Sequence, residues 1–102
     1  MKSRVAGFEW DEGNWPKCGK HGVSQAEIEQ VLRAAPLVLP DRHPQDAETR
    51  FNAVGKNASG RYVFVVFTLR DQQGQRLVRP ISARYMHAKE AENYERQKGN
   101  EA

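Results

Sequence analysis

The stretch Tyr62-Val-Phe-Val-Val-Phe-Thr-Leu69 decides the fold of this 102-residue chain. Its β-branched and aromatic side chains occupy both the even and the odd positions, so both faces of a strand formed here are apolar. A run of this kind is typical of a strand that is buried on both sides. We therefore expect residues 62–69 to form the central strand of a sheet.

Turn sequences flank the central strand on both sides. Asn57–Gly60 precedes it and Asp71–Gly74 follows it, and both are rich in residues that favour turns. Arg50–Lys56 alternates in the manner of a strand, and Gln75–Ala83 is expected to form a third strand. Pro80 lacks an N–H group, so this third strand must lie at an edge or contain a bulge.

The N-terminal half predicts shorter elements. Phe8–Trp10 alternates as a short strand, Asp11–Asn14 forms a turn, and Pro16 suits the first turn of a short helix that ends at Gly19 or Gly22.

A second helix begins after Ser24. Ser24 and Glu27 form a capping-box sequence, Val23 and Ile28 occupy the positions of a hydrophobic staple, and Pro36 stops the helix. Helical periodicity is carried by four apolar residues: Ile28, Val31, Leu32 and Ala35.

The remaining segments complete an α+β fold. Leu37–Leu39 is expected to be a small strand, Pro40–Glu48 a polar loop that contains His43, and Met86–Lys98 a final helix. The order of elements predicts helices packed on a curved antiparallel sheet.

Length and composition indicate a single small domain. One cysteine excludes an internal disulfide, and no apolar run approaches the roughly 18 residues of a membrane span. The first ten residues lack the apolar core of a signal peptide. We expect one domain over residues 1–102, with its core at about 8–97, in the cytoplasm and without a membrane partner.

Charge is unevenly distributed, although 16 Lys and Arg against 13 Asp and Glu make the chain only mildly basic. Asp71 is the single acidic residue between Arg50 and Lys89, a segment with eight basic residues. Such a block predicts a positive surface for a polyanion. The alternative is that arginines on strands protect sheet edges and keep the sheet soluble.

The segment Lys17-Cys-Gly-Lys-His21 concentrates reactive side chains. A metal site would use Cys18 and His21, with a third ligand from His43 or His87. The alternative for Cys18 is a small buried residue, and for Lys20 and His21 it is a solvated helix end, where cations are favourable.

An ordered set of short motifs resembles the BrnT family of toxins. The set consists of FEWDEGN at 8–14, KHGVS at 20–24, RF at 50–51, FVVFT at 64–68 and ISAR at 81–84, followed by Glu90 and Tyr94. The resemblance extends from Phe8 to Glu95 and implies a RelE-like fold and metal-independent endoribonuclease activity without a cofactor. It also implies a cognate antitoxin, usually a ribbon-helix-helix protein similar to BrnA, through which the toxin contacts DNA only indirectly.

The resemblance assigns candidate catalytic roles to several residues. His21 would act as acid or base, Lys20 as a supporting cation, and Arg50 and Arg84 as phosphate clamps. Histidine titrates near neutral pH, and arginine's planar fork matches phosphate oxygens.

Two further candidates lie on the last helix. Glu90 and Tyr94 share one of its faces and would transfer a proton or orient another group. The alternative is a structural pair, in which Tyr94 docks on the sheet and Glu90 binds an arginine.

The chain departs from the family pattern at two positions. Pro80 replaces the usual β-branched residue before Ile-Ser-Ala-Arg, and His87 stands where a hydroxyl helix cap is common.

An alternative function is a non-catalytic module that holds an antitoxin or nucleic acid on a basic sheet surface. Phosphate binding and phosphate cleavage require the same residue types, so the residues alone leave both functions open.

Overall fold

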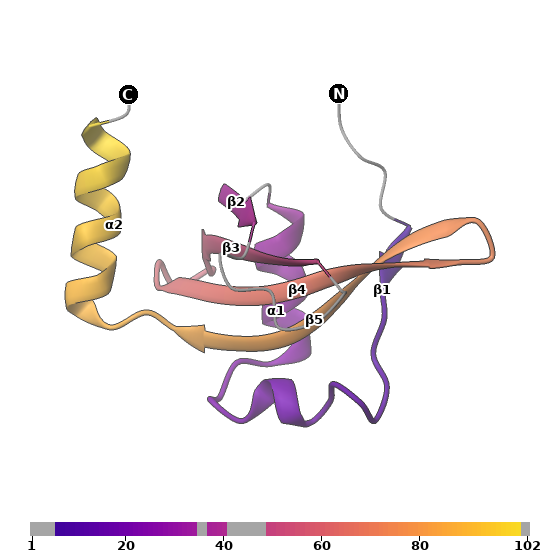
Figure 1. The fold of residues 1–102 in the computed structure, drawn as a ribbon. Helices are drawn as coiled ribbons and strands as arrows, with labels where there is room; N and C mark the ends of the chain where they lie inside the picture. Colours follow the sequence, from indigo (N-terminus) through magenta and orange to yellow (C-terminus); the bar gives the residue numbers. More distant parts are fainter. Residues whose placement is uncertain (1–5, 35–36, 41–48, 101–102) are drawn as a thin grey trace.

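A computed structural model describes residues 6–34, 37–40 and 49–100. It is α+β, as expected, with one five-stranded sheet in the order β1-β5-β4-β3-β2. Figure 1 shows α1 behind the sheet and α2 beyond its end. The elements are β1 (Gly7–Phe8), the 3-10 helix η1 (Lys17–Gly19), α1 (Gln25–Arg33), β2 (Leu37–Pro40), β3 (Arg50–Lys56), β4 (Tyr62–Gln72), β5 (Gln75–Tyr85) and α2 (Ala88–Asn100).

The central position of β4 is confirmed. It pairs antiparallel with β3 and β5, and β2 extends the sheet antiparallel to β3. β1 instead runs parallel to β5, with Gly7 opposite Leu77 and Phe8 opposite Val78. The predicted loop at 40–48, including His43, lies outside the described residues from position 41 onward.

The β4–β5 turn is tighter than predicted. Asp71 and Gln72 belong to β4, and only Gln73 and Gly74, with φ of 53° and 79°, connect it to β5. Two consecutive residues with positive φ match the right-handed twist of the paired strands. This two-residue turn explains why Asp71 and Gln72, which were predicted to be turn residues, belong to the strand.

The bulge expected at Pro80 is present in β5. Val66 pairs with Ser82 while Phe67 pairs with Pro80, so Ile81 is the additional residue. Without it, the ladder would place Arg84 opposite Val63 on the buried face. The shift by one residue pairs Arg84 with Phe64 on the opposite face.

The core lies between α1 and one face of the sheet. Ser24 Oγ accepts a hydrogen bond from Glu27 N at 3.1 Å, and the staple residues Val23 and Ile28 are both buried. Cys18 is also in the core, which agrees with its interpretation as a small buried residue and not as a metal ligand. The strands contribute Ala53, Val63, Val65, Phe67, Val78 and Ala83.

The position of α2 differs from the predicted packing of helices on the sheet. It stands at the end of the sheet (Figure 1), and its polar sequence has few apolar residues to bury. Tyr94 meets Tyr62 edge-on with 5.1 Å between ring centroids, and Glu95 forms an ion pair with Lys56 at 3.8 Å. The helix is therefore held by individual side-chain contacts.

No helix among residues 6–34 and 49–100 is long and apolar enough to cross a membrane.

Candidate active site

Arg84 is positioned by contacts on two sides. Its guanidinium carbon lies 4.9 Å from the centroid of the Phe64 ring, and Nη1 and Nη2 each donate a hydrogen bond of 2.8 Å to the Glu90 carboxylate. This two-point pairing fixes the plane of the guanidinium. The remaining N–H groups of Arg84 stay available to a phosphate.

The pairing with Arg84 lowers the pKa of Glu90 to about 2, and a hydrogen bond from the His87 backbone N–H at 3.1 Å acts in the same direction. Glu90 is therefore ionised at neutral pH. This state suits a residue that orients Arg84 and His87 better than one that carries a proton.

The low pKa of Glu90 predicts an acid-sensitive attachment of α2. Glu90 has an ordinary pKa of 4.5, so its stabilising contribution is complete above that pH and is lost as the pH falls toward about 2. We expect the melting temperature of the parent to fall over this window more steeply than that of Glu90→Gln. Parallel melting curves for both proteins from pH 6 to pH 2 would contradict the prediction.

Arg84 lines a surface cavity of about 560 Å³ together with His21. Its other lining residues are Arg61, Tyr85, Met86, His87 and Ala88. The cavity joins the loop after η1, the start of β4 and the segment between β5 and α2. It therefore brings together four nitrogen-bearing side chains that are distant in sequence: His21, Arg61, Arg84 and His87.

His21 reaches the cavity because the chain turns sharply around it. Gly22 has a φ of 91°, a conformation that L side chains rarely adopt, and Val23 immediately enters the core. Gly19 lies against the Trp15 ring, where a Cβ would come within 2.4 Å of a ring carbon. These two glycines fold the loop tightly and leave the His21 side chain exposed.

The other predicted site residues lie outside this cavity. Lys20 is exposed beside His21, and Tyr94 packs on Tyr62. Arg50 pairs with Thr68 in the ladder, four positions along β4 from Phe64, a separation of about 13 Å at 3.3 Å per residue. Arg50 and Arg84 lie on the same face of the sheet. Because they are far apart along it, they would contact different parts of a ligand.

Arg61 was missed as a site residue. Its guanidinium carbon lies 3.9 Å from the Tyr85 ring centroid, and the Tyr85 hydroxyl donates hydrogen bonds of 2.8 and 2.9 Å to the Glu27 carboxylate. Glu27, in the first turn of α1, thus fixes Tyr85, which supports Arg61. The signal that could have found Arg61 was its place directly before the strand that begins at Tyr62, whose first residues pair with Arg84 and Tyr85.

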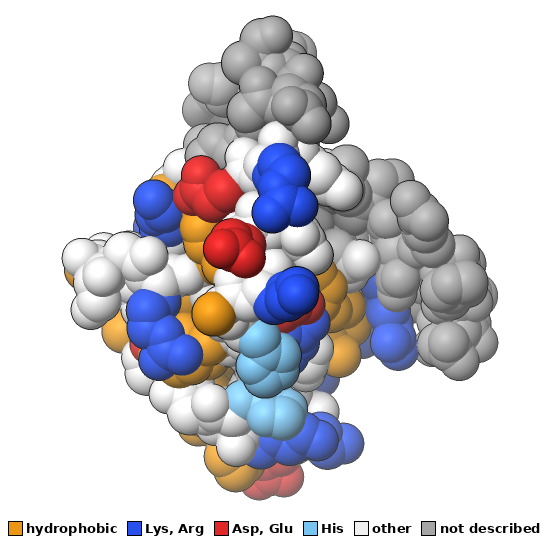
Figure 2. Space-filling view, turned by 90° about the vertical axis from the view of Figure 1, so that its left-hand side faces the viewer, with side chains coloured by type: hydrophobic (Ala, Val, Ile, Leu, Met, Phe, Trp, Pro, Cys, Tyr) orange, Lys and Arg blue, Asp and Glu red, His pale blue; other side chains and the backbone are white. Residues whose placement is uncertain are grey.

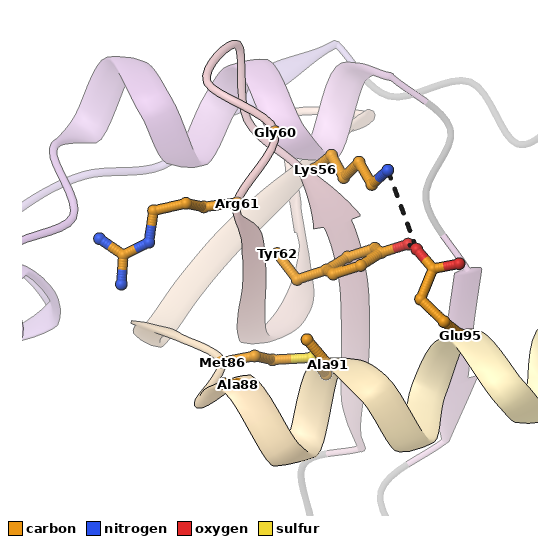
Figure 3. A pocket seen from close by; sticks show the side chains of 8 residues that line it. All are labelled: Lys56, Gly60, Arg61, Tyr62, Met86, Ala88, Ala91 and Glu95. Atoms are coloured by element: carbon orange, nitrogen blue, oxygen red, sulfur yellow. Dashed lines mark hydrogen bonds and ion pairs between the residues drawn. The ribbon is translucent and has the colours of Figure 1, made fainter.

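A second cavity of about 430 Å³ adjoins the first and shares Arg61, Met86 and Ala88 with it. Figure 3 shows Lys56 and Glu95 at one end and Arg61 directed away from them at the other. The Tyr62 ring forms part of the wall, and its hydroxyl donates a hydrogen bond to Glu95. Burial, with the contact to Glu95, raises the pKa of Tyr62 to about 12, so the phenol keeps its proton at neutral pH.

A metal site at Cys18 finds little support in the geometry. Burial raises the pKa of the Cys18 thiol to about 11, which disfavours the thiolate that binds metals. Across the described ranges, which exclude His43, no three His, Cys, Asp or Glu side chains are grouped so as to hold a metal ion.

Residues 10–90 match the family model described as "Ribonuclease toxin, BrnT, of type II toxin-antitoxin system". The chain belongs to the BrnT family. No curated protein matches it. As a BrnT ribonuclease toxin, the chain is an endoribonuclease that acts on RNA and has a cognate antitoxin.

The positive surface of this BrnT toxin is smaller than the sequence predicts. Arg79 pairs with Glu9 at 2.8 Å and Asp11 at 2.9 Å, Arg76 pairs with Asp71 at 3.2 Å, and Glu90 neutralises much of Arg84. Glu9, Asp11 and Glu90 from outside the basic block, together with Asp71 within it, thus compensate part of its charge. Arg61, by contrast, has no carboxylate partner within the described part of the chain, so the cavity keeps a net positive lining.

Proposed function

We propose that this toxin cleaves RNA without a metal, by attack of a ribose 2′-hydroxyl on the adjacent phosphorus in the cavity that contains His21 and Arg84. The 2′-hydroxyl gives its proton to a base, and its oxygen forms a bond to phosphorus. The bond from phosphorus to the 5′-oxygen breaks, and that oxygen takes a proton from an acid. The products are a 2′,3′-cyclic phosphate and a 5′-hydroxyl.

The cavity supplies groups for each requirement of this reaction. His21 is exposed, and its imidazole makes no hydrogen bond within the described residues, so it is free to exchange a proton with the substrate. Arg84 and Arg61 provide N–H donors for the negative charge that develops on the phosphorane. Glu90 holds Arg84 in place, Lys20 adds a nearby cation, and Tyr94 supports the structure through Tyr62.

The observation that carries the proposal is the common location of His21 and Arg84. They come from a loop near the N-terminus and from the end of β5, yet both line one cavity. Proton transfer and charge stabilisation must act on the same phosphate, so this proximity is the geometric condition for cleavage.

The antitoxin is proposed to be a ribbon-helix-helix protein that covers the Arg50 and Arg84 face and links the toxin to DNA. This sheet face lies opposite α1. Val54, Phe64 and Val66 are only half-buried there, between the two arginines. An acidic or helical segment laid across it would bury apolar surface and pair with both cations.

Expression of the toxin alone in a bacterial host tests the proposed activity. Growth is expected to stop and bulk RNA to be degraded after induction, while co-expression with the adjacent gene product restores growth. Normal growth and intact RNA at verified protein levels would favour the non-catalytic module instead.

The purified complex tests where the antitoxin binds. We expect it to cleave RNA far more slowly than the free toxin, because its partner covers Arg84. Cleavage at the full rate by an intact complex would show that the site is not under the partner.

A further inference from the structure

His87 is a second histidine at the cavity. Figure 2 shows the two described histidines next to one another, with basic side chains on either side. Both line the 560 Å³ cavity, although 66 positions separate them in the sequence. His87 follows β5 and Arg61 precedes β4, and the two strand ends remain joined there by a hydrogen bond of 2.9 Å from Met86 N to the Tyr62 carbonyl.

The backbone of His87 is fixed while its side chain is unused. Its N–H donates to Glu90 Oε1 at 3.1 Å, and its carbonyl accepts from Ala91 N at 2.9 Å. The imidazole is exposed and makes no hydrogen bond to any described residue. These backbone contacts therefore hold His87 at the cavity and leave its ring nitrogens unoccupied.

Capping does not explain the histidine. At the residue before a helix, Ser, Thr, Asp or Asn stabilises the first turn, typically by about 1 kcal/mol relative to alanine. The His87 side chain is not one of these preferred caps. Its imidazole instead lines the same cavity as His21.

We propose that His87 is the second proton-transfer group of the cleavage reaction, acting with His21 on the two sides of one phosphate. One imidazole takes the proton of the 2′-hydroxyl as the bond from O2′ to phosphorus forms. The other, entering as imidazolium, gives its proton to the 5′-oxygen as the bond from phosphorus to that oxygen breaks. This inference rests on the proposed function and assigns its missing acid or base.

The charges around His87 come from every element that meets it. His21 belongs to the loop after η1, Arg61 directly precedes β4, Arg84 and Tyr85 belong to β5, and Glu90 belongs to α2. Two cations and one carboxylate thus surround the histidine pair. Arg61 and Arg84 are placed to hold the phosphate between the two rings.

His87→Ser separates catalysis from structure. Serine restores the preferred helix cap, so we expect an equal or higher melting temperature together with a cleavage rate lowered by roughly 10²–10⁴-fold. The parent should show a bell-shaped dependence of kcat/KM on pH, and His87→Ser should lose one limb of the bell. Lys89→Ser, two residues later in α2, is the matched control and should keep both the rate and the profile.

A substrate with a good leaving group identifies the role of each histidine. A nucleoside 3′-(p-nitrophenyl phosphate) needs no proton on its leaving oxygen, so it should restore activity to the variant that lacks the acid. We expect this rescue for one of His87→Ser and His21→Ala and not for the other.

The outcomes separate this inference from the proposed function. A parent rate and an unchanged pH profile for His87→Ser, with His21→Ala inactive, would overturn the role of His87 alone. Full activity of His21→Ala and Arg84→Ala would overturn both proposals.

Discussion

His21→Ala is expected to lower the rate of RNA cleavage by roughly 10²–10⁴-fold, the usual cost of losing a group that transfers a proton in the transition state. A loss of this size should abolish growth inhibition. The side chain is exposed and makes no hydrogen bond within the described residues, so the variant should melt like the parent. Single-turnover cleavage and a melting curve on the same preparation measure both effects.

Two controls make the His21 result specific. Lys17→Ala removes an exposed cation from the neighbouring η1 and should change neither property. Ile28→Ala truncates a fully buried side chain and should cost roughly 2–5 kcal/mol of stability, so its activity falls together with its melting temperature. A His21→Ala protein that remains toxic and melts like the parent would contradict the catalytic role and would favour the alternative, in which His21 is a solvated residue at a helix end.

Arg84→Ala is expected to cost on the order of 3 kcal/mol of transition-state stabilisation, or about 10²-fold in rate, because it removes the proposed donor to the phosphate. The ion pair with Glu90 is half-exposed, so its loss should cost no more than about 1 kcal/mol of stability. Cleavage rates of the purified variant measure the effect on catalysis.

Arg76→Ala and Glu90→Gln are the controls for Arg84. Arg76 lies on the same strand, is exposed and pairs with Asp71 away from the cavity, so its loss should have no effect on cleavage. Glu90→Gln keeps Arg84 but loosens its orientation and should give an intermediate rate. Full toxicity of Arg84→Ala would favour the binding-module alternative over cleavage at this site.

Local chemistry made the sheet predictable. Residues 62–69 are apolar on both faces, turn residues bound them, and β3 has the predicted bounds. Pro80 indicated either an edge position or a bulge, because it cannot donate a hydrogen bond to the strand ladder. The placement of α2 was not predictable in the same way, since a polar helix has no apolar stripe to specify the surface on which it packs.

The candidate site depended on long-range register. His21 and Arg84 were named from the motif set, whereas Arg61 and His87 line the cavity because they lie just before β4 and just after β5, which pair with one another. The bulge in β5 decides the face on which Arg84 lies. The sequence suggested a bulge but did not give its direction. The basic block was overestimated for a related reason, because Glu9 and Asp11 meet Arg79 only after β1 docks on β5.

The chemistry of the cleaved ends tests metal-free attack by the 2′-hydroxyl most directly. The purified toxin is incubated in EDTA with an oligoribonucleotide and with the same sequence carrying 2′-O-methyl groups, and a His21→Ala preparation controls for contaminating nucleases. We expect cleavage of the first substrate only, with 2′,3′-cyclic phosphate and 5′-hydroxyl ends by mass spectrometry. Cleavage that requires added Zn²⁺ or Mg²⁺, or products with 5′-phosphate and 3′-hydroxyl ends, would contradict it.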